Sequence, residues 1–253
     1  MRKIIMIVTF DHPLSERVRS FIRIKHLFCR FTHNLESEDK WLHHVAITSL
    51  FEIMECSSRV ELKRDILQEL ERQRQRLHTT QSNPELLDRV NQVAQDLQEV
   101  QQKFGQHIRD NEWLMAMKQR MQIAGATTPI EFPSYYLWQQ ISPEKRKQDL
   151  MTWSKAIMPT YHATELLLEI LRSQPTVLEC NAKKGNYQYS SLAQDMHLLT
   201  IELDLAENVL PEVAANKYFT HIRFLTASQN QVRGQQVERD VPFCMKICSF
   251  NTL

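Results

Sequence analysis

The sequence predicts an α+β protein that is mainly α-helical, with a helical domain of long antiparallel helices and a small antiparallel β domain. Glycine is rare: the chain has four in 253 residues, and Gly105 is the only one between Pro13 and Gln122, which suits long helices. Apolar residues in this first part recur at helical spacing, whereas short β-branched and aromatic runs follow Pro175. We therefore expect three parts: 1–12 as an N-terminal strand that joins the β domain, 13–174 as the helical domain, and 175–253 as the β-strand domain.

The composition is that of an ordinary globular protein with almost no net charge. Apolar residues make up 42% of the chain and charged residues 24%, which excludes wholesale disorder. The formal net charge of +1 creates no overall field that would attract nucleic acid or an anionic membrane, so electrostatic recognition must be local. The five cysteines are an odd number scattered along the chain, which favours reduced thiols in the cytoplasm.

The N-terminal apolar run is predicted to be a buried strand. Ile4 to Val8 follow Arg2 and Lys3, as in a signal peptide, but the run is too short, and Asp11, His12 and Pro13 follow it without a small-residue cleavage site. Nowhere do about 18 apolar residues run together, so we expect no membrane-spanning segment.

Cap residues and apolar spacing predict the helices of the first domain. Asn83 is a favourable N-cap before Pro84, Ser142 is another before Pro143, and Ser58 with Glu61 resembles a capping box. The predicted helices cover 14–31, 38–56, 58–78, 84–104, 108–121 and 143–171, the last with a bend or a restart at Pro159.

One predicted helix carries an apolar seam of the coiled-coil kind. Its first members, spaced four, three and four residues apart, are Leu86, Val90, Val93 and Leu97. A short polar turn joins this helix to the preceding one, which predicts an antiparallel hairpin. The seam is a candidate homodimer interface; the alternative is that it packs only within its own chain.

The β domain is predicted from five short segments separated by turn-forming residues. These segments are 176–181, 186–190, 197–205, 218–226 and 237–247.

No local motif for catalysis, metal or cofactor binding is visible. The four glycines are too far apart to form a phosphate-binding loop. Cys244 and Cys248 lack the second ligand pair of a structural zinc site, and neighbouring His43 and His44 lack the spacing of a zinc protease. We therefore expect a non-enzymatic protein without a metal or cofactor, in which the two strand cysteines have no assigned role.

Positive charge is concentrated on the predicted first helix. Its positive side chains recur at i, i+4, i+7 and i+11, so they share one narrow stripe: Arg19, Arg23, His26 and Arg30. Like charges at this spacing repel each other, which favours an anionic partner. Arg59 and Lys63 repeat the pattern near the start of a later helix.

At these residues the chain resembles the ZapD family, the Z-ring-associated proteins of bacterial cell division. The resemblance begins at Phe10–Leu14 and the basic helix, covers almost the full length, and is weakest at Thr79–Lys103. Further segments that carry it are Leu67–Gln73, Gly105-Gln106, Arg109-Asp110, Gln119-Arg120, Phe132-Pro133 with Trp138, and Ile222–Phe224.

The resemblance implies a cytoplasmic, non-catalytic homodimer that binds the C-terminal tail of FtsZ, the tubulin-like division protein, and bundles its protofilaments at the mid-cell ring. The positions that match basic residues of the family are Arg19, Arg23, Arg59, Lys217 and Arg223. Three positions depart from the family pattern, because Glu112, Tyr136 and Phe219 replace basic residues.

The function hypothesis joins the basic residues to the homodimer. Arginine suits an acidic peptide because its planar guanidinium pairs carboxylates with two hydrogen bonds. Two such sites in a dimer, facing a filament that displays many tails, would raise avidity without new contacts. The alternative is a helical nucleic-acid binder that uses the same stripe; the near-zero net charge and the lack of a known nucleic-acid module argue against it.

Overall fold

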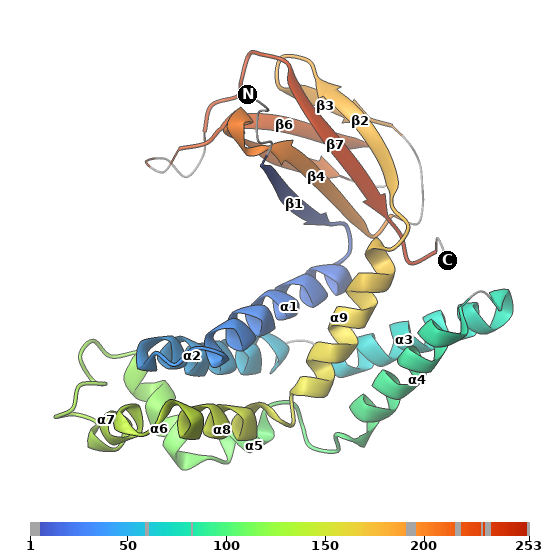
Figure 1. The fold of residues 1–253 in the computed structure, drawn as a ribbon. Coiled ribbons are helices and arrows are strands. Elements are labelled where there is room, and N and C mark those ends of the chain that lie inside the picture. The colour runs from blue at the N-terminus through green and yellow to red at the C-terminus, as the bar shows by residue number, and fades with distance from the viewer. Residues whose placement is uncertain are drawn as a thin grey trace. The chain divides into compact units, whose positions relative to one another are not determined.

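A computed structural model describes residues 6–58, 61–81, 83–190, 196–215, 219–228, 230 and 234–251, and within them it confirms the mainly helical α+β class (Figure 1). The helices are α1 (Glu16–Leu35), α2 (Lys40–Ser58), α3 (Leu62–Thr80), α4 (Pro84–Glu99), α5 (Gln106–Arg109), α6 (Glu112–Met121), α7 (Pro133–Gln140), α8 (Pro143–Ser154) and α9 (Met158–Arg172). The strands are β1 (Ile7–Pro13), β2 (Thr176–Ala182), β3 (Asn186–Tyr189), β4 (Leu198–Asp204), β5 (Val209–Ala215), β6 (Thr220–Thr226) and β7 (Val241–Cys248).

The chain divides into two compact units. Met1–Arg19 and Glu169–Leu253 form the first, which we call the β unit, and Ser20–Leu168 form the second, the helical unit. Both boundaries fall inside helices, α1 and α9, rather than in the loops at which the sequence changes character.

The β unit contains two antiparallel sheets. In the described residues their strand orders are β1-β4-β7-β2 and β3-β6-β5. The N-terminal strand pairs with β4, with Phe10 opposite Ile201. β5 was not predicted from the sequence, because Pro211 and Glu212 are poor strand residues; its place at the edge of the sheet tolerates a residue without a backbone N–H.

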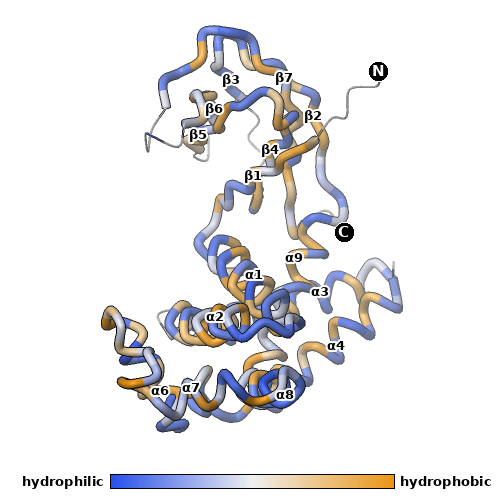
Figure 2. The backbone as a smooth tube through the Cα atoms, turned by 60° about the vertical axis from the view of Figure 1, so that its left-hand side comes forward, coloured by the Kyte–Doolittle hydropathy of each residue, from blue (hydrophilic) through white to orange (hydrophobic). Residues whose placement is uncertain are grey.

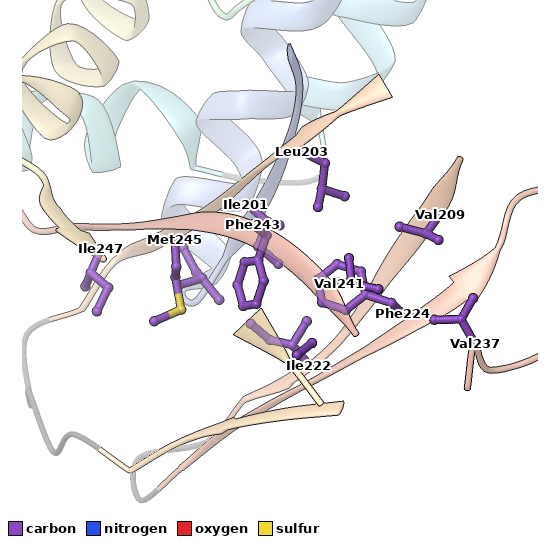
Figure 3. Close-up of a cluster of buried hydrophobic side chains, with 12 residues drawn as sticks. Ile201, Leu203, Val209, Ile222, Phe224, Val237, Val241, Phe243, Met245 and Ile247 are labelled. Carbon is purple, nitrogen blue, oxygen red and sulfur yellow. The ribbon is translucent and has the colours of Figure 1, made fainter. Parts of the chain in front are cut away.

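Inward-facing side chains of both sheets form the core of the β unit (Figure 3). On β7, buried Val241, Phe243 and Met245 alternate with more exposed residues, as expected for a strand with one buried face. The Phe243 ring lies 5.1 Å from the Phe224 ring of β6, so the two sheets meet through aromatic packing.

Two of the predicted helix caps are confirmed and one is wrong. The side chain of Asn83 accepts a hydrogen bond from the backbone N–H of Leu86 at 3.0 Å, and Ser142 caps α8 in the same way. The capping box predicted at Ser58 is wrong, because α2 runs through Ser58 and α3 begins at Leu62, with Glu61 as an N-cap that makes no side-chain cap hydrogen bond.

Helices α3 and α4 pack against each other as the predicted hairpin (Figure 1). Hydrophobic and hydrophilic stretches alternate along α4 (Figure 2), and the apolar residues of α4 fall on one face. Val90 and Leu97 are fully buried within the chain, whereas Leu86 and Val93 are half-buried. At least part of the seam is therefore used inside the protomer.

A buried arginine joins three segments of the helical unit. Arg146 of α8 is only 4% exposed. Its guanidinium donates hydrogen bonds to the carbonyl oxygen of Glu38 at 2.7 Å, to those of Gln139 and Ile141, and from Nε to Nδ1 of His43 at 2.9 Å. Because Nδ1 accepts this bond, His43 is the neutral tautomer with its proton on Nε2.

The buried histidine makes stability depend on pH. Burial, together with the nearby Arg146 guanidinium, lowers the pKa of His43 from 6.5, and burial also lowers the pKa of His44. The unfolded chain takes up these protons as the pH falls through about 6.5, while the folded chain resists them, so we expect the free energy of unfolding to fall on acidification. Urea unfolding between about pH 7.5 and pH 5.5 measures this slope, which is at most about 1.4 kcal/mol per pH unit for each histidine. His43→Asn should make the slope shallower and leave the part that belongs to His44; an equally steep slope in that variant would contradict the assignment.

Candidate protein-binding site

The predicted basic stripe is present on α1 but is not uniform. Arg19, Arg23 and His26 are exposed, whereas Arg30 is half-buried. Arg19 forms an ion pair with Glu16 of the same helix at 3.1 Å. Arg23 has no ion-pair or hydrogen-bond partner among the described residues, so its guanidinium can pair with an external carboxylate.

Arg30 is held inside the helical unit rather than offered to a partner. Its guanidinium contacts Glu52 at 2.6 Å and donates from Nε to the hydroxyl of Ser49 at 2.9 Å. Both partners belong to α2. The basic stripe available to a ligand therefore ends at His26.

The other predicted partner-binding residues fall into different parts of the structure. Lys63 is half-buried on α3, and its Nζ donates to the carbonyl oxygen of Val100 at 2.6 Å. Arg223 lies on β6 and forms an ion pair with Glu212, directly opposite it on β5. Arg59 and Lys217 lie outside the described residues.

The three positions that depart from the family pattern are all exposed. Glu112 begins α6, Tyr136 lies on α7, and Phe219 precedes β6. They are therefore available for contact, but they supply one negative charge and two aromatic surfaces in place of positive charge.

A large groove runs beside α3 in the helical unit. It has a volume of about 1430 Å³ and is bounded by α3, the end of α4 and the segment that leads to α5. We call it the α3 groove and define it by Lys63, Leu67, Leu97, Val100, Lys103 and Arg109. Of these residues, the sequence predicts only Lys63 as a partner-binding residue.

A short non-helical segment forms one wall of the α3 groove. The helix predicted to reach Phe104 ends at Glu99, so residues 100–105 leave the helical path. Two cations hold this segment: Lys63 donates to the carbonyl oxygen of Val100, and Arg109 donates to that of Phe104 at 2.8 Å. In the sequence, this wall is indicated only by Gly105, which lies between the predicted helices 84–104 and 108–121.

The described residues show no arrangement suited to metal chemistry. Within them no group of three or more His, Cys, Asp and Glu side chains could hold a metal ion. Cys244 and Cys248 are free thiols, and burial raises the pKa of both, which makes the reactive thiolate rarer at neutral pH. Among the helices in the described ranges, none combines the length and apolarity needed to cross a membrane.

Comparison with known proteins identifies similar sequences. The family model ZapD, described as a cell division protein, matches residues 22–223. A relative from Chromobacterium violaceum, named "Cell division protein ZapD", is 40% identical over 251 residues, which cover 96% of this chain and 100% of the relative. The similarity to this relative therefore extends over both units.

Proposed function

The chain belongs to the ZapD family of cell division proteins, and from that premise we propose that it binds the C-terminal tail of FtsZ and, as a homodimer, cross-links FtsZ protofilaments. It would act in the cytoplasm, at the mid-cell division ring. The tail is proposed to contact Arg19, Arg23, Arg59, Lys63, Lys217 and Arg223.

The exposed stripe on α1 is the observation that carries this proposal. Arg19, Arg23 and His26 share one face of a helix in a protein whose formal net charge is +1. Arg23 has no acidic partner among the described residues. Exposed like charges on one helix face cost stability unless an anion neutralises them, and an acidic peptide supplies the carboxylates that guanidinium groups pair with best.

Bundling would follow from having two sites in one particle. A filament presents one tail for each FtsZ subunit, so a dimer that holds one tail can capture a second from a neighbouring filament at high effective concentration. Leu86 and Val93 of α4 are only half-buried in the protomer and can contribute to the proposed interface, whereas Val90 and Leu97 of the same seam are already buried inside the protomer. If sedimentation velocity showed only monomers under conditions in which bundles form, this mechanism would be wrong.

Reversing the charge at Arg23 tests the proposed contact. We expect Arg23→Glu to weaken binding to FtsZ filaments about tenfold, because it replaces an attraction to the acidic tail by a repulsion. Co-sedimentation with FtsZ measures the bound fraction, which should also fall as salt rises from about 50 mM to about 300 mM.

Two controls isolate the contact. Lys155→Glu makes the same charge change at an exposed position of the helical unit with no partner among the described residues, and should bind FtsZ normally. FtsZ without its C-terminal tail should not sediment the wild-type protein. Equal binding by the Arg23→Glu and wild-type proteins, or full binding to tailless FtsZ, would overturn the proposal.

A further inference from the structure

The α3 groove has the dimensions of a site for a polypeptide. Its volume of about 1430 Å³ is larger than the range of about 300–1,000 Å³ that is usual for small-molecule sites. All of its lining residues belong to the helical unit, so the groove exists within that unit alone.

The inner surface of the groove is apolar. Leu67 and Val100 are half-buried and Leu97 is fully buried, although all three line the groove. Aliphatic side chains that remain partly open to water gain free energy when another apolar surface covers them. The occupant should therefore carry apolar side chains.

The charges of the groove select an acidic occupant. Each carboxylate in the lining already has an arginine partner: Glu61 pairs with Arg64, and Glu71 pairs with Arg74 at 2.8 Å. By contrast, Lys63, Lys103 and Arg109 have no carboxylate partner among the described residues.

Two of these cations are bound only to backbone carbonyls and keep further donors for a ligand. Lys63 uses one of three ammonium hydrogens on Val100, and Arg109 uses Nη1 on Phe104. Lys103 is exposed at the rim. A peptide that combines carboxylates with apolar side chains would neutralise the rim and cover the leucines together.

We infer that the α3 groove binds the apolar part of the FtsZ tail, and that Lys103 and Arg109 form ion pairs with the carboxylates of the tail. This inference rests on the proposed function and extends it, because it adds Leu67, Lys103 and Arg109 to the tail-binding surface. The basic stripe on α1 then supplies charge attraction, while the groove supplies apolar burial and hence most of the resistance to dissociation at high salt.

A monomeric peptide probe tests the groove without the influence of avidity. A fluorescein-labelled peptide with the sequence of the FtsZ C-terminal tail is titrated with the full-length protein, and anisotropy gives the Kd. We expect Lys103→Glu and Leu67→Gln each to raise the Kd about tenfold. The Lys155→Glu variant, with the same charge change outside the groove, should match the wild type.

The possible results of this titration distinguish a failure of the groove inference from a failure of the proposed function. If the wild-type protein binds the peptide and only Arg23→Glu weakens it, the groove inference is wrong and the proposed function stands. If the wild-type protein does not bind the peptide, both are wrong. If Leu67→Gln leaves the Kd unchanged but abolishes the dimer in sedimentation velocity, the occupant is a second copy of this chain, which also overturns the inference.

Circular dichroism and thermal unfolding establish that the variants are folded. Lys103 is exposed and its side chain forms no hydrogen bond or ion pair with the described residues, so Lys103→Glu should keep the native fold even if Leu67→Gln disturbs the packing of α3 on α4. Lys103→Glu therefore still tests the groove if Leu67→Gln fails to fold.

Discussion

Replacing Arg146 by methionine is expected to lower the free energy of unfolding by about 3–5 kcal/mol. Methionine keeps an unbranched apolar stem but has no hydrogen-bond donor, so the carbonyl oxygens of Glu38, Gln139 and Ile141 would lose a buried partner. The Nδ1 atom of His43 would lose its donor as well. Each buried acceptor left unsatisfied costs about 1–3 kcal/mol, partly offset because a buried charge is removed.

The neighbouring position provides a matched control for Arg146→Met. Lys145→Met makes the same kind of change on the same helix, but Lys145 is exposed, and its ammonium group forms an i,i+4 ion pair with Asp149 at 3.0 Å and a hydrogen bond to Gln148 at 3.5 Å. Its loss should cost less than about 1 kcal/mol. Urea unfolding of both variants gives the comparison; equal losses would mean that the buried hydrogen bonds of Arg146 contribute little to stability.

Local cap chemistry predicted part of the fold correctly, and tertiary packing decided the rest. Asn83 before Pro84 begins α4 as expected, because the cap needs only residues close in sequence. Ser58 has the same chemistry, yet it is the last residue of α2 rather than the cap that begins α3. β5 contains Pro211 and is a strand only because β6 supplies its backbone partners, which the sequence of β5 alone does not reveal.

The candidate site was also predictable only in part. Helical spacing placed Arg19, Arg23 and Arg30 on one stripe, but it could not show that Glu52 and Ser49 of another helix engage Arg30. The α3 groove was missed because its walls come from segments far apart in sequence and because α4 ends earlier than its apolar pattern. One of these walls is the non-helical segment 100–105, and its path therefore depends on Gly105.

Gly105 ends this segment in a backbone conformation that favours glycine. Its φ is +70°, a left-handed value that costs other residues about 1 kcal/mol. A Cβ atom at this position would also lie 2.7 Å from Cγ of Met54, whose side chain is only 2% exposed and has little room to move. We expect Gly105→Ala to lower the free energy of unfolding by about 2–4 kcal/mol, from strain and overpacking together.

Gly125→Ala separates the strain from the overpacking. Gly125 has a similar φ of +78°, but an added Cβ would meet no atom within 4 Å, so only the backbone strain of about 1 kcal/mol should appear. Chemical denaturation of both variants gives the difference, which we assign to the contact with Met54. Equal losses would show that this contact relaxes without cost. A folded Gly105→Ala protein should also bind the FtsZ tail peptide more weakly, because displacing residues 100–105 moves the wall that Lys63 and Arg109 hold.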